Sequence, residues 1–368
     1  MPFINDKLKY YLEHQEEMER RETQEEGLSK LPITRFTFQK DQIMDKLRES
    51  IFGQDESLEK ISSMLKVVHA DITEKHRPLY IAMLMGPTGV GKTEMVKILA
   101  EAIYGERDSF CRIDMNTLAQ EHYAAAITGA PPGYVGSKEG TTVFDEDKIS
   151  GSFSKPGIVL LDEIEKADSS VIQSLLNVFD NGRMILTNGE RIIDFRNAMI
   201  FMTSNLGSKQ IFEFAEHDFK SRLRRWRYKW NPANWGNEDH LLMNKVIQEE
   251  LENHFSPEFL NRIDDTMIFN WLGTDSLVPI IDKLIGDLNE RLVKHQCSLE
   301  LDDEAKDFLI RAGFHKHYGA RSIKRAIRKH VEVPLAEFLE ENLSAGTFLR
   351  GISKQGKIVF LLNGGGET

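Results

Sequence analysis

The segment YIAMLMGPTGVGKTEMVKILAEAIY, residues 80–104, constrains the fold of this chain more than any other. The apolar run 80–85 has the length of a buried strand, and residues 94–104 place their apolar side chains on one face of a helix. Between them lies GPTGVGKT, residues 86–93. A strand that enters a helix through a glycine-rich turn lets backbone N–H groups surround a phosphate. The segment therefore predicts a phosphate-binding loop at the end of a buried strand.

Each polar residue of this loop has a predicted role in binding a nucleotide with magnesium. Lys92 carries a compact positive charge to the β- and γ-phosphates, and Thr93 offers a hydroxyl oxygen to Mg²⁺. Glycines permit the backbone angles that turn N–H groups inward. A chance glycine-rich turn is the alternative, and the flanking strand and helix argue against it. The predicted site comprises Gly86, Pro87, Thr88, Gly89, Val90, Gly91, Lys92 and Thr93.

Further apolar runs predict an α/β fold. Short runs that suit strands buried on both faces alternate with helical segments, which is typical of a parallel sheet wrapped by helices. Such sheets bind ligands at the carboxyl ends of their strands. The predicted strands are 80–85, 110–115, 157–162, 198–203 and 266–270.

The run GIVLLDEIEK supplies acidic partners for the loop. Asp162 ends a predicted strand and is suited to hold the magnesium shell, and Glu163 is suited to polarise a water for attack on the γ-phosphate. The alternative is an acidic pair that only caps a helix, because anions are favoured at helix N-termini. The preceding strand–loop–helix favours the catalytic interpretation.

Hydrolysis of a phosphate also needs groups that orient the water and stabilise developing negative charge. Three residues near later strand ends or a helix start are candidates: Asn205, Arg262 and Arg321. From spacing alone they remain candidates, because such residues are usually only solvated.

Composition narrows the class of protein. The formal net charge of −11 disfavours nucleic acid as the main partner without excluding it. No apolar run is long enough to span a bilayer, and the polar N-terminal segment lacks the apolar core of a secretion signal. The two cysteines, Cys111 and Cys297, lie far apart without neighbouring metal ligands. These features predict a cytoplasmic location.

We expect three parts along the chain. Residues 1–45 form a charged helical leader and linker, 46–272 a large ATPase domain, and 273–368 a smaller, mostly helical domain with a short sheet. In the smaller domain, strands are expected at 298–301 and 357–362, with two helices between them.

Several motifs in order resemble one family. IFGQDESLEKI, GPTGVGKTE, RIDM, GAPPGYVG, LLDEIEKA, DFRN, MTSNLGS, EFLNRID and YGARSIKRAI follow one another between about residues 50 and 340. This series resembles the C-terminal ATPase module of the Clp-type AAA+ protein-remodelling machines, the unfoldases and disaggregases. The resemblance implies an ATPase with Mg²⁺ that assembles as a homo-oligomeric ring, usually a hexamer, and acts on polypeptides.

The resemblance also implies roles for single residues. Ile51 and Phe52 belong to a segment beside the adenine, Asn205 matches sensor 1, and Arg262 matches an arginine finger that reaches the neighbouring subunit. Arg321 matches sensor 2. The family's pore loop is Gly133, Tyr134, Val135 and Gly136, whose aromatic ring grips a threaded polypeptide with little specificity.

The segment 212–240 departs from the family pattern, because it interleaves basic residues with tryptophan and tyrosine. It could bind single-stranded nucleic acid, dock an adaptor, or pack on its own domain. The leader is a second candidate for adaptor binding. An alternative function is therefore remodelling of nucleic acid or a protein–nucleic acid complex, and another is an ATP-switched assembly factor.

Overall fold

A computed structural model describes residues 34–118, 144–185, 192–208, 239–314, 319–341, 348–354 and 356–363. The chain divides into two compact units. The first contains Asp55–Gly86, Lys92–Ile268 and the residues up to Glu49. The second contains Ser50–Gln54, Pro87–Gly91 and the chain from Phe269 onward. Five residues of the glycine-rich loop thus group with the C-terminal part of the chain.

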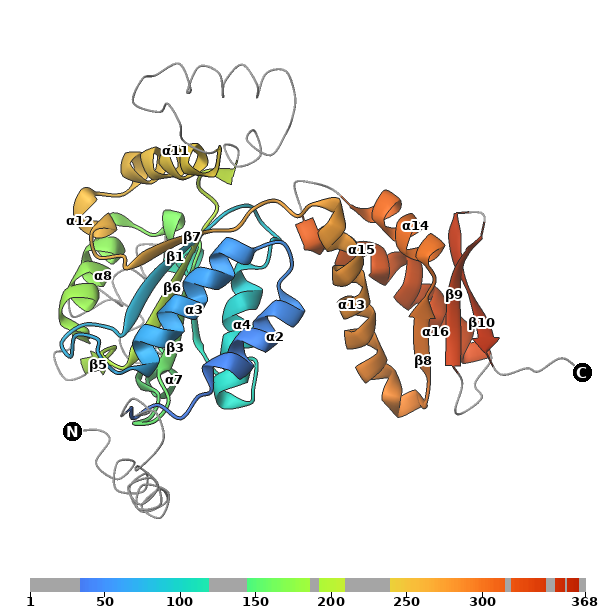
Figure 1. Ribbon diagram of the computed structural model, residues 1–368, viewed down its shortest axis with the longest axis horizontal. Coiled ribbons are helices and arrows are strands. Elements are labelled where there is room, and N and C mark those ends of the chain that lie inside the picture. The colour runs from blue at the N-terminus through green and yellow to red at the C-terminus, as the bar shows by residue number, and fades with distance from the viewer. Residues whose placement is uncertain are drawn as a thin grey trace, which may run out of the picture. The chain divides into compact units, whose positions relative to one another are not determined.

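The first unit combines a parallel sheet with helices around it (Figure 1). Its helices are α2 (Lys40–Ser50), α3 (Asp55–His69), α4 (Lys92–Tyr104), α5 (Met115–Leu118), α7 (Glu146–Ser150), η1 (Ile164–Lys166), α8 (Ser169–Asn181), α11 (Asp239–His254) and α12 (Pro257–Leu260). Its strands are β1 (Tyr80–Met85), β2 (Cys111–Asp114), β3 (Gly157–Asp162), β4 (Arg183–Ile185), β5 (Ile192–Asp194), β6 (Ala198–Ser204) and β7 (Asp265–Ile268).

Five of these strands form one sheet in the order β2-β3-β6-β1-β7, and every pairing in it is parallel. All residues of β6 are buried, as are all but one of β1 and of β3. This burial explains their continuous apolar sequences, because helices cover both faces of a parallel sheet. The predicted α/β sheet wrapped by helices is therefore confirmed. All of its strands point their carboxyl ends to the same edge.

A short antiparallel hairpin was not among the expected strands. It joins β4 to β5, with Ile185 opposite Ile192, between α8 and the buried strand β6. Three-residue strands are too short for alternation to show in a sequence. The turn before them requires Gly182, whose φ is +60° and where an added Cβ would lie 2.9 Å from the carbonyl oxygen of His76.

The second unit has a small mixed sheet beside helices. Its helical elements are η3 (Thr274–Ser276), α13 (Leu277–Leu292), η4 (Val293–His295), α14 (Asp303–Gly313), α15 (Gly319–Ile327), η6 (Arg328–Glu332) and α16 (Val333–Glu341). Its strands are β8 (Ser298–Leu301), β9 (Phe348–Lys354) and β10 (Lys357–Asn363). β8 pairs parallel with β9, and β9 pairs antiparallel with β10.

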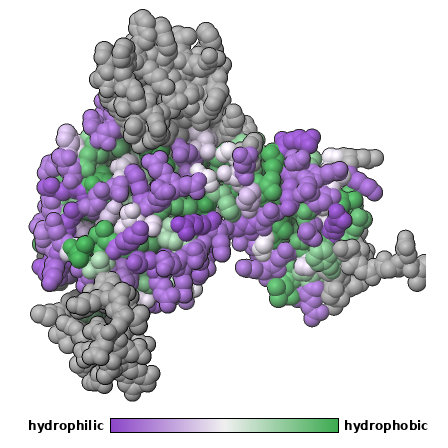
Figure 2. Space-filling model, in the orientation of Figure 1, coloured by the Kyte–Doolittle hydropathy of each residue, from purple (hydrophilic) through white to green (hydrophobic). Residues whose placement is uncertain are grey.

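The central strand β9 was missed by sequence reasoning. Its sequence, FLRGISK, contains a glycine and two basic residues, so it lacks the apolar run used to find the other strands. Gly351 is required there by close packing, because an added Cβ would lie 2.5 Å from Leu301 Cδ2. In the view of Figure 2, hydrophilic residues cover most of the described surface and hydrophobic residues form smaller patches among them.

Candidate functional site

The glycine-rich loop leaves the carboxyl end of β1 and enters α4. Three of its glycines have φ values that L-residues rarely adopt: +135° at Gly86, +79° at Gly89 and +112° at Gly91. Side chains at these positions would strain the backbone. The loop conformation therefore depends on glycine at all three positions, as expected for a phosphate cradle.

Lys92, the first residue of α4, is buried, with 8% of its surface exposed. Its ammonium donates to the carbonyl oxygen of Gly86 and, at 3.0 Å, to Oδ1 of Asn205. Asn205 follows the end of β6, the strand that pairs with β1. The parallel sheet thus brings together the predicted phosphate-binding lysine and the predicted water-orienting asparagine.

Asp162 and Glu163 lie at the end of β3, beside the same strand β6. The hydroxyl of Thr203 donates to Asp162 Oδ1 at 2.5 Å and accepts from the Glu163 backbone N–H at 3.0 Å. Glu163 adopts φ +58° and ψ +54°, a left-handed conformation that costs about 1–3 kcal/mol for a residue other than glycine. Its side chain makes no capping hydrogen bond to η1. The capping interpretation of Glu163 therefore lacks its defining contact.

The carboxylate of Glu163 contacts two amides. Asn116 Nδ2 donates to Oε2 at 2.6 Å, and Asn205 Nδ2 lies 3.5 Å from Oε1. Asn116 is in turn oriented by Asp114, whose Oδ1 accepts from its Nδ2 at 3.0 Å and from its backbone N–H at 2.9 Å. Sequence reasoning missed Asn116 and Asp114. The available signal was their position at the end of the strand predicted at 110–115, which contains Asp114 and is followed by Asn116.

A third residue missed from the sequence is Glu165. Its Oε1 accepts from the Asn205 backbone N–H at 3.1 Å, and its carbonyl oxygen lies 3.3 Å from His254 Nε2. Glu165 therefore ties the residue after β6 to η1 and to the end of α11.

Arg262 contacts a different acidic residue. Its Nε forms an ion pair with Asp180 near the end of α8, and its carbonyl oxygen accepts from Arg77 at 3.1 Å. α8 and α12 pack together through Phe179 and Phe259, with ring centroids 5.6 Å apart. About two fifths of each side chain of the Arg262–Asp180 pair is exposed, whereas the Nε atom of Arg262 is buried.

The second unit contains Ile51 and Phe52, predicted to lie beside an adenine. Ile51 is buried, and Phe52 is partly exposed. Gln54, from the same segment, forms two hydrogen bonds with the backbone of Asn270. Its Nε2 donates to the Asn270 carbonyl oxygen at 2.9 Å, and its Oε1 accepts from the Asn270 N–H at 2.8 Å. Arg321 is exposed in the first turn of α15.

Comparison with known proteins places this geometry in a family. Residues 77–266 match the family described as AAA domain (Cdc48 subfamily), and residues 272–349 match the C-terminal, D2-small domain, of ClpB protein. A Pseudomonas aeruginosa protein named "ATP-dependent protease ATP-binding subunit-like protein AmiB" is 44% identical over 94% of both chains. The chain belongs to the Clp-type AAA+ ATPases.

Two further relatives of this Clp-type ATPase differ in the share of their own length that aligns with this chain. A Rhodococcus erythropolis "ATP-dependent protease ATP-binding subunit-like protein" is 40% identical over 86% of this chain and 88% of its own length. The "Chaperone protein ClpB" of Vibrio cholerae is 37% identical over 83% of this chain, which corresponds to 32% of ClpB. The predicted family, AAA+ fold and ATPase activity are therefore confirmed.

Some predictions for this Clp-type ATPase lie outside the described residues. These are residues 1–33 of the leader, most of the 212–240 segment, and the loop Gly133, Tyr134, Val135 and Gly136. Across the parts of the chain that the structure describes, no helix is long and apolar enough to cross a membrane. Both cysteines are buried free thiols, and burial raises the pKa of the Cys111 thiol.

Proposed function

We propose that this Clp-type ATPase is a protein-remodelling chaperone that couples ATP hydrolysis to the threading of a polypeptide through the pore of a homo-oligomeric ring, as a hexamer. Gly86–Lys92 holds the phosphates, with Ile51 and Phe52 beside the adenine. Thr93 and Asp162 would hold Mg²⁺, because hydroxyl and carboxylate oxygens are ligands that this ion prefers. The ion would supply positive charge against the negative charge that develops on the phosphates.

Glu163 acts as the general base in this proposal, and Asn205 orients the attacking water with it. Both side chains meet near Lys92, whose ammonium contacts Asn205. Arg262 and Arg321 serve as the arginine finger and as sensor 2. The partial exposure of the Arg262 side chain, about two fifths, supports an action toward a neighbouring subunit.

The hydrogen bond between Asn116 and Glu163 is the contact by which, in this proposal, hydrolysis would be coupled to movement of substrate. Asn116, which donates to the Glu163 carboxylate, lies in α5, and α5 ends at Leu118. The segment that follows along the chain contains Tyr134. In this proposal Asn116 would couple a change at Glu163 to the segment that contains the pore loop. Polypeptide would be gripped by the Tyr134 ring, whose large apolar area suits many sequences.

Replacing Tyr134 tests this function. Tyr134→Ala should abolish unfolding of a fluorescent protein substrate, because the loop loses its gripping side chain, while ATP turnover stays within about twofold of wild type. Unfolding is followed by loss of substrate fluorescence, and turnover by release of phosphate.

Tyr134→Phe is the matched control and should retain unfolding, because the aromatic surface remains. Normal unfolding by Tyr134→Ala would contradict the threading mechanism. Loss of both activities in Tyr134→Ala would instead place Tyr134 in the fold or in the ATPase site.

The 212–240 segment remains a sequence-based candidate for binding an adaptor or nucleic acid. No contact among the described residues favours one of these partners over the others. ATP-driven protein remodelling therefore stands as the main proposal, together with the predicted cytoplasmic location.

A further inference from the structure

Both oxygens of the Asp162 carboxylate are already bound by other side chains of this ATPase. Thr203 donates to Oδ1, and Arg112 donates to Oδ2 through Nε at 3.2 Å and through its terminal nitrogen at 2.5 Å. The Asp162 side chain is 13% exposed, whereas that of Arg112 is 49% exposed. Asp162 therefore holds a cation of the chain itself at the position where the proposed function places magnesium.

The strand register explains how Arg112 reaches Asp162. β2 lies at the edge of the sheet beside β3, with Asp114 opposite Asp162 and Arg112 opposite Leu160. Residues two apart on a strand share a face, so Arg112 lies on the same face as Asp114. Its long side chain runs along the strand toward the carboxyl edge and ends at Asp162.

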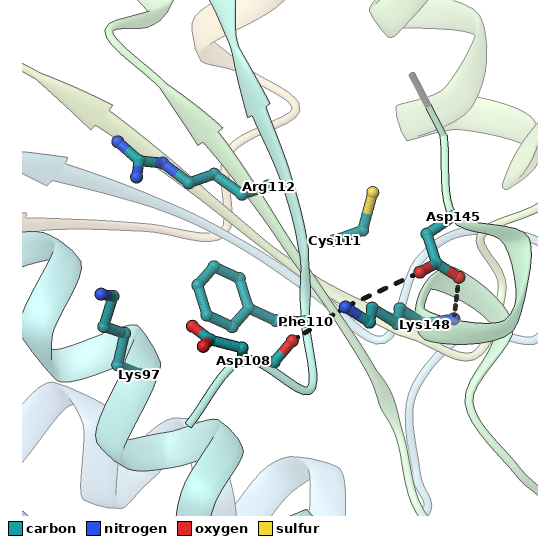
Figure 3. Close-up of a pocket in the computed structure, with 7 residues that line it drawn as sticks. All are labelled: Lys97, Asp108, Phe110, Cys111, Arg112, Asp145 and Lys148. Carbon is teal, nitrogen blue, oxygen red and sulfur yellow. Dashed lines mark hydrogen bonds and ion pairs between the residues drawn. The ribbon is translucent and has the colours of Figure 1, made fainter. Parts of the chain in front are cut away.

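A pocket lies beside Arg112 and is lined by residues of both charges. Its volume is about 320 Å³, and Arg112 lines it together with Lys97, Asp108, Phe110, Cys111, Asp145 and Lys148 (Figure 3). Two of these residues, Asp108 and Asp145, carry carboxylates. Lys148 contacts both segments, at 2.9 Å from the Asp108 carbonyl oxygen and 3.7 Å from Asp145 Oδ2. Because about half of the Arg112 side chain is exposed, its guanidinium can leave Asp162 for solvent.

Two cations that need one carboxylate oppose each other's binding, both by occupying its oxygens and by mutual repulsion. We propose that Arg112 is a positioning residue that occupies Asp162 and sets the Mg²⁺ concentration at which this ATPase binds nucleotide with metal. The inference rests on the proposed role of Asp162 as a magnesium ligand. Arg112 would compete with Mg²⁺ for the Asp162 carboxylate and so weaken metal binding.

The direction of the effect separates this role from a structural one. An ion pair that only joins β2 to β3 would, when removed, loosen the site and weaken nucleotide binding with or without Mg²⁺. A competing cation, when removed, strengthens Mg²⁺ binding. A gain of metal affinity on mutation is therefore specific to the proposal.

Arg112→Met tests it, because methionine keeps much of the apolar stem and removes the charge. Binding of a fluorescent ATP analogue to the full-length protein is measured as Mg²⁺ is titrated, and again in EDTA. Mn²⁺ binding in the presence of nucleotide, followed by electron paramagnetic resonance, reports the metal directly. We expect the half-saturating metal concentration to fall about twofold to fivefold, the range available to a half-exposed ion pair.

Affinity in EDTA should change less than about twofold, and the difference in metal affinity should shrink at high salt, where exposed charges are screened. An unchanged or raised half-saturating concentration would overturn the proposal. Arg112→Lys keeps a cation and should stay closer to wild type. Arg112→Gln, a polar neutral variant, should shift metal affinity in the same direction as Arg112→Met and replaces it if methionine impairs folding.

Two controls separate the inference from the proposed function. Arg291→Met removes a matched arginine–carboxylate pair, Arg291 to Glu332 at 2.7 Å in the second unit, and should not alter metal dependence. Asp162→Asn should remove most of the strengthening of nucleotide binding by Mg²⁺. If Asp162→Asn keeps that strengthening, the proposed magnesium site fails; if it loses it while Arg112→Met has no effect, only the inference fails.

Discussion

The five-stranded and the three-stranded sheet of this molecule use their edges differently. The carboxyl edge of the five-stranded parallel sheet collects polar side chains from three strand ends, including Asp162, Glu163 and Asn205. The three-stranded mixed sheet packs one face against helices and leaves the other exposed, with Val359 and Leu361 at 40% and 45% exposure. The carboxyl ends of parallel strands lie at one edge of the sheet, so the loops that follow them gather there. β9 and β10 run in opposite directions, so their carboxyl ends lie at opposite edges. We therefore expect mutations in the first sheet's edge to affect chemistry and those in the second sheet to affect stability.

Glu163→Gln provides the largest expected effect on the chemical side of this comparison. It should lower ATP turnover by about a hundredfold or more, because the amide cannot accept the proton of the attacking water. ATP affinity and the melting temperature should stay near wild type, since glutamine retains the shape of the side chain. Turnover is measured by phosphate release, and affinity with a fluorescent ATP analogue. If Glu163→Gln keeps more than about a tenth of wild-type turnover, Glu163 is not the general base.

Leu349→Ala tests the structural side. Leu349 lies in the central strand β9 and is fully buried, so its truncation should lower the free energy of unfolding by about 2–5 kcal/mol. Urea denaturation followed by circular dichroism measures the change. Leu361→Ala, on the exposed face of the neighbouring strand, is the control and should cost less than about 1 kcal/mol. Equal losses for the two variants would show that the faces of this sheet are not distinct.

Asn116→Ala should have a smaller effect than Glu163→Gln, because Asn116 only orients the general base. Turnover should fall about tenfold with little change in the KM for ATP, the loss expected for one hydrogen bond made to a charged group. Gln248→Ala removes an exposed amide that bonds Glu252 and should leave turnover unchanged. A parallel rise in KM would assign Asn116 to nucleotide binding instead.

The strand–loop–helix around Lys92 and the acidic end of β3 were readable from the sequence because each is local. A glycine pattern, an apolar run and a following carboxylate need no knowledge of distant residues. The same locality explains what was missed. β9 carries no continuous apolar run, and its strand conformation comes from pairing with β8 and β10, which lie far from each other along the chain.

By itself, the sequence determined the α/β class, the phosphate loop, and Asp162 and Glu163 as the acidic residues beside it. Only the tertiary structure decided what surrounds those carboxylates: Thr203 between them, Asn116 on Glu163 and Arg112 on Asp162. The physical reason is that long connecting segments separate the paired strands along the chain. Residues some 40 to 50 positions apart meet only when parallel strands pair in register, and the hydrogen bonds formed there set the charge and geometry of the site.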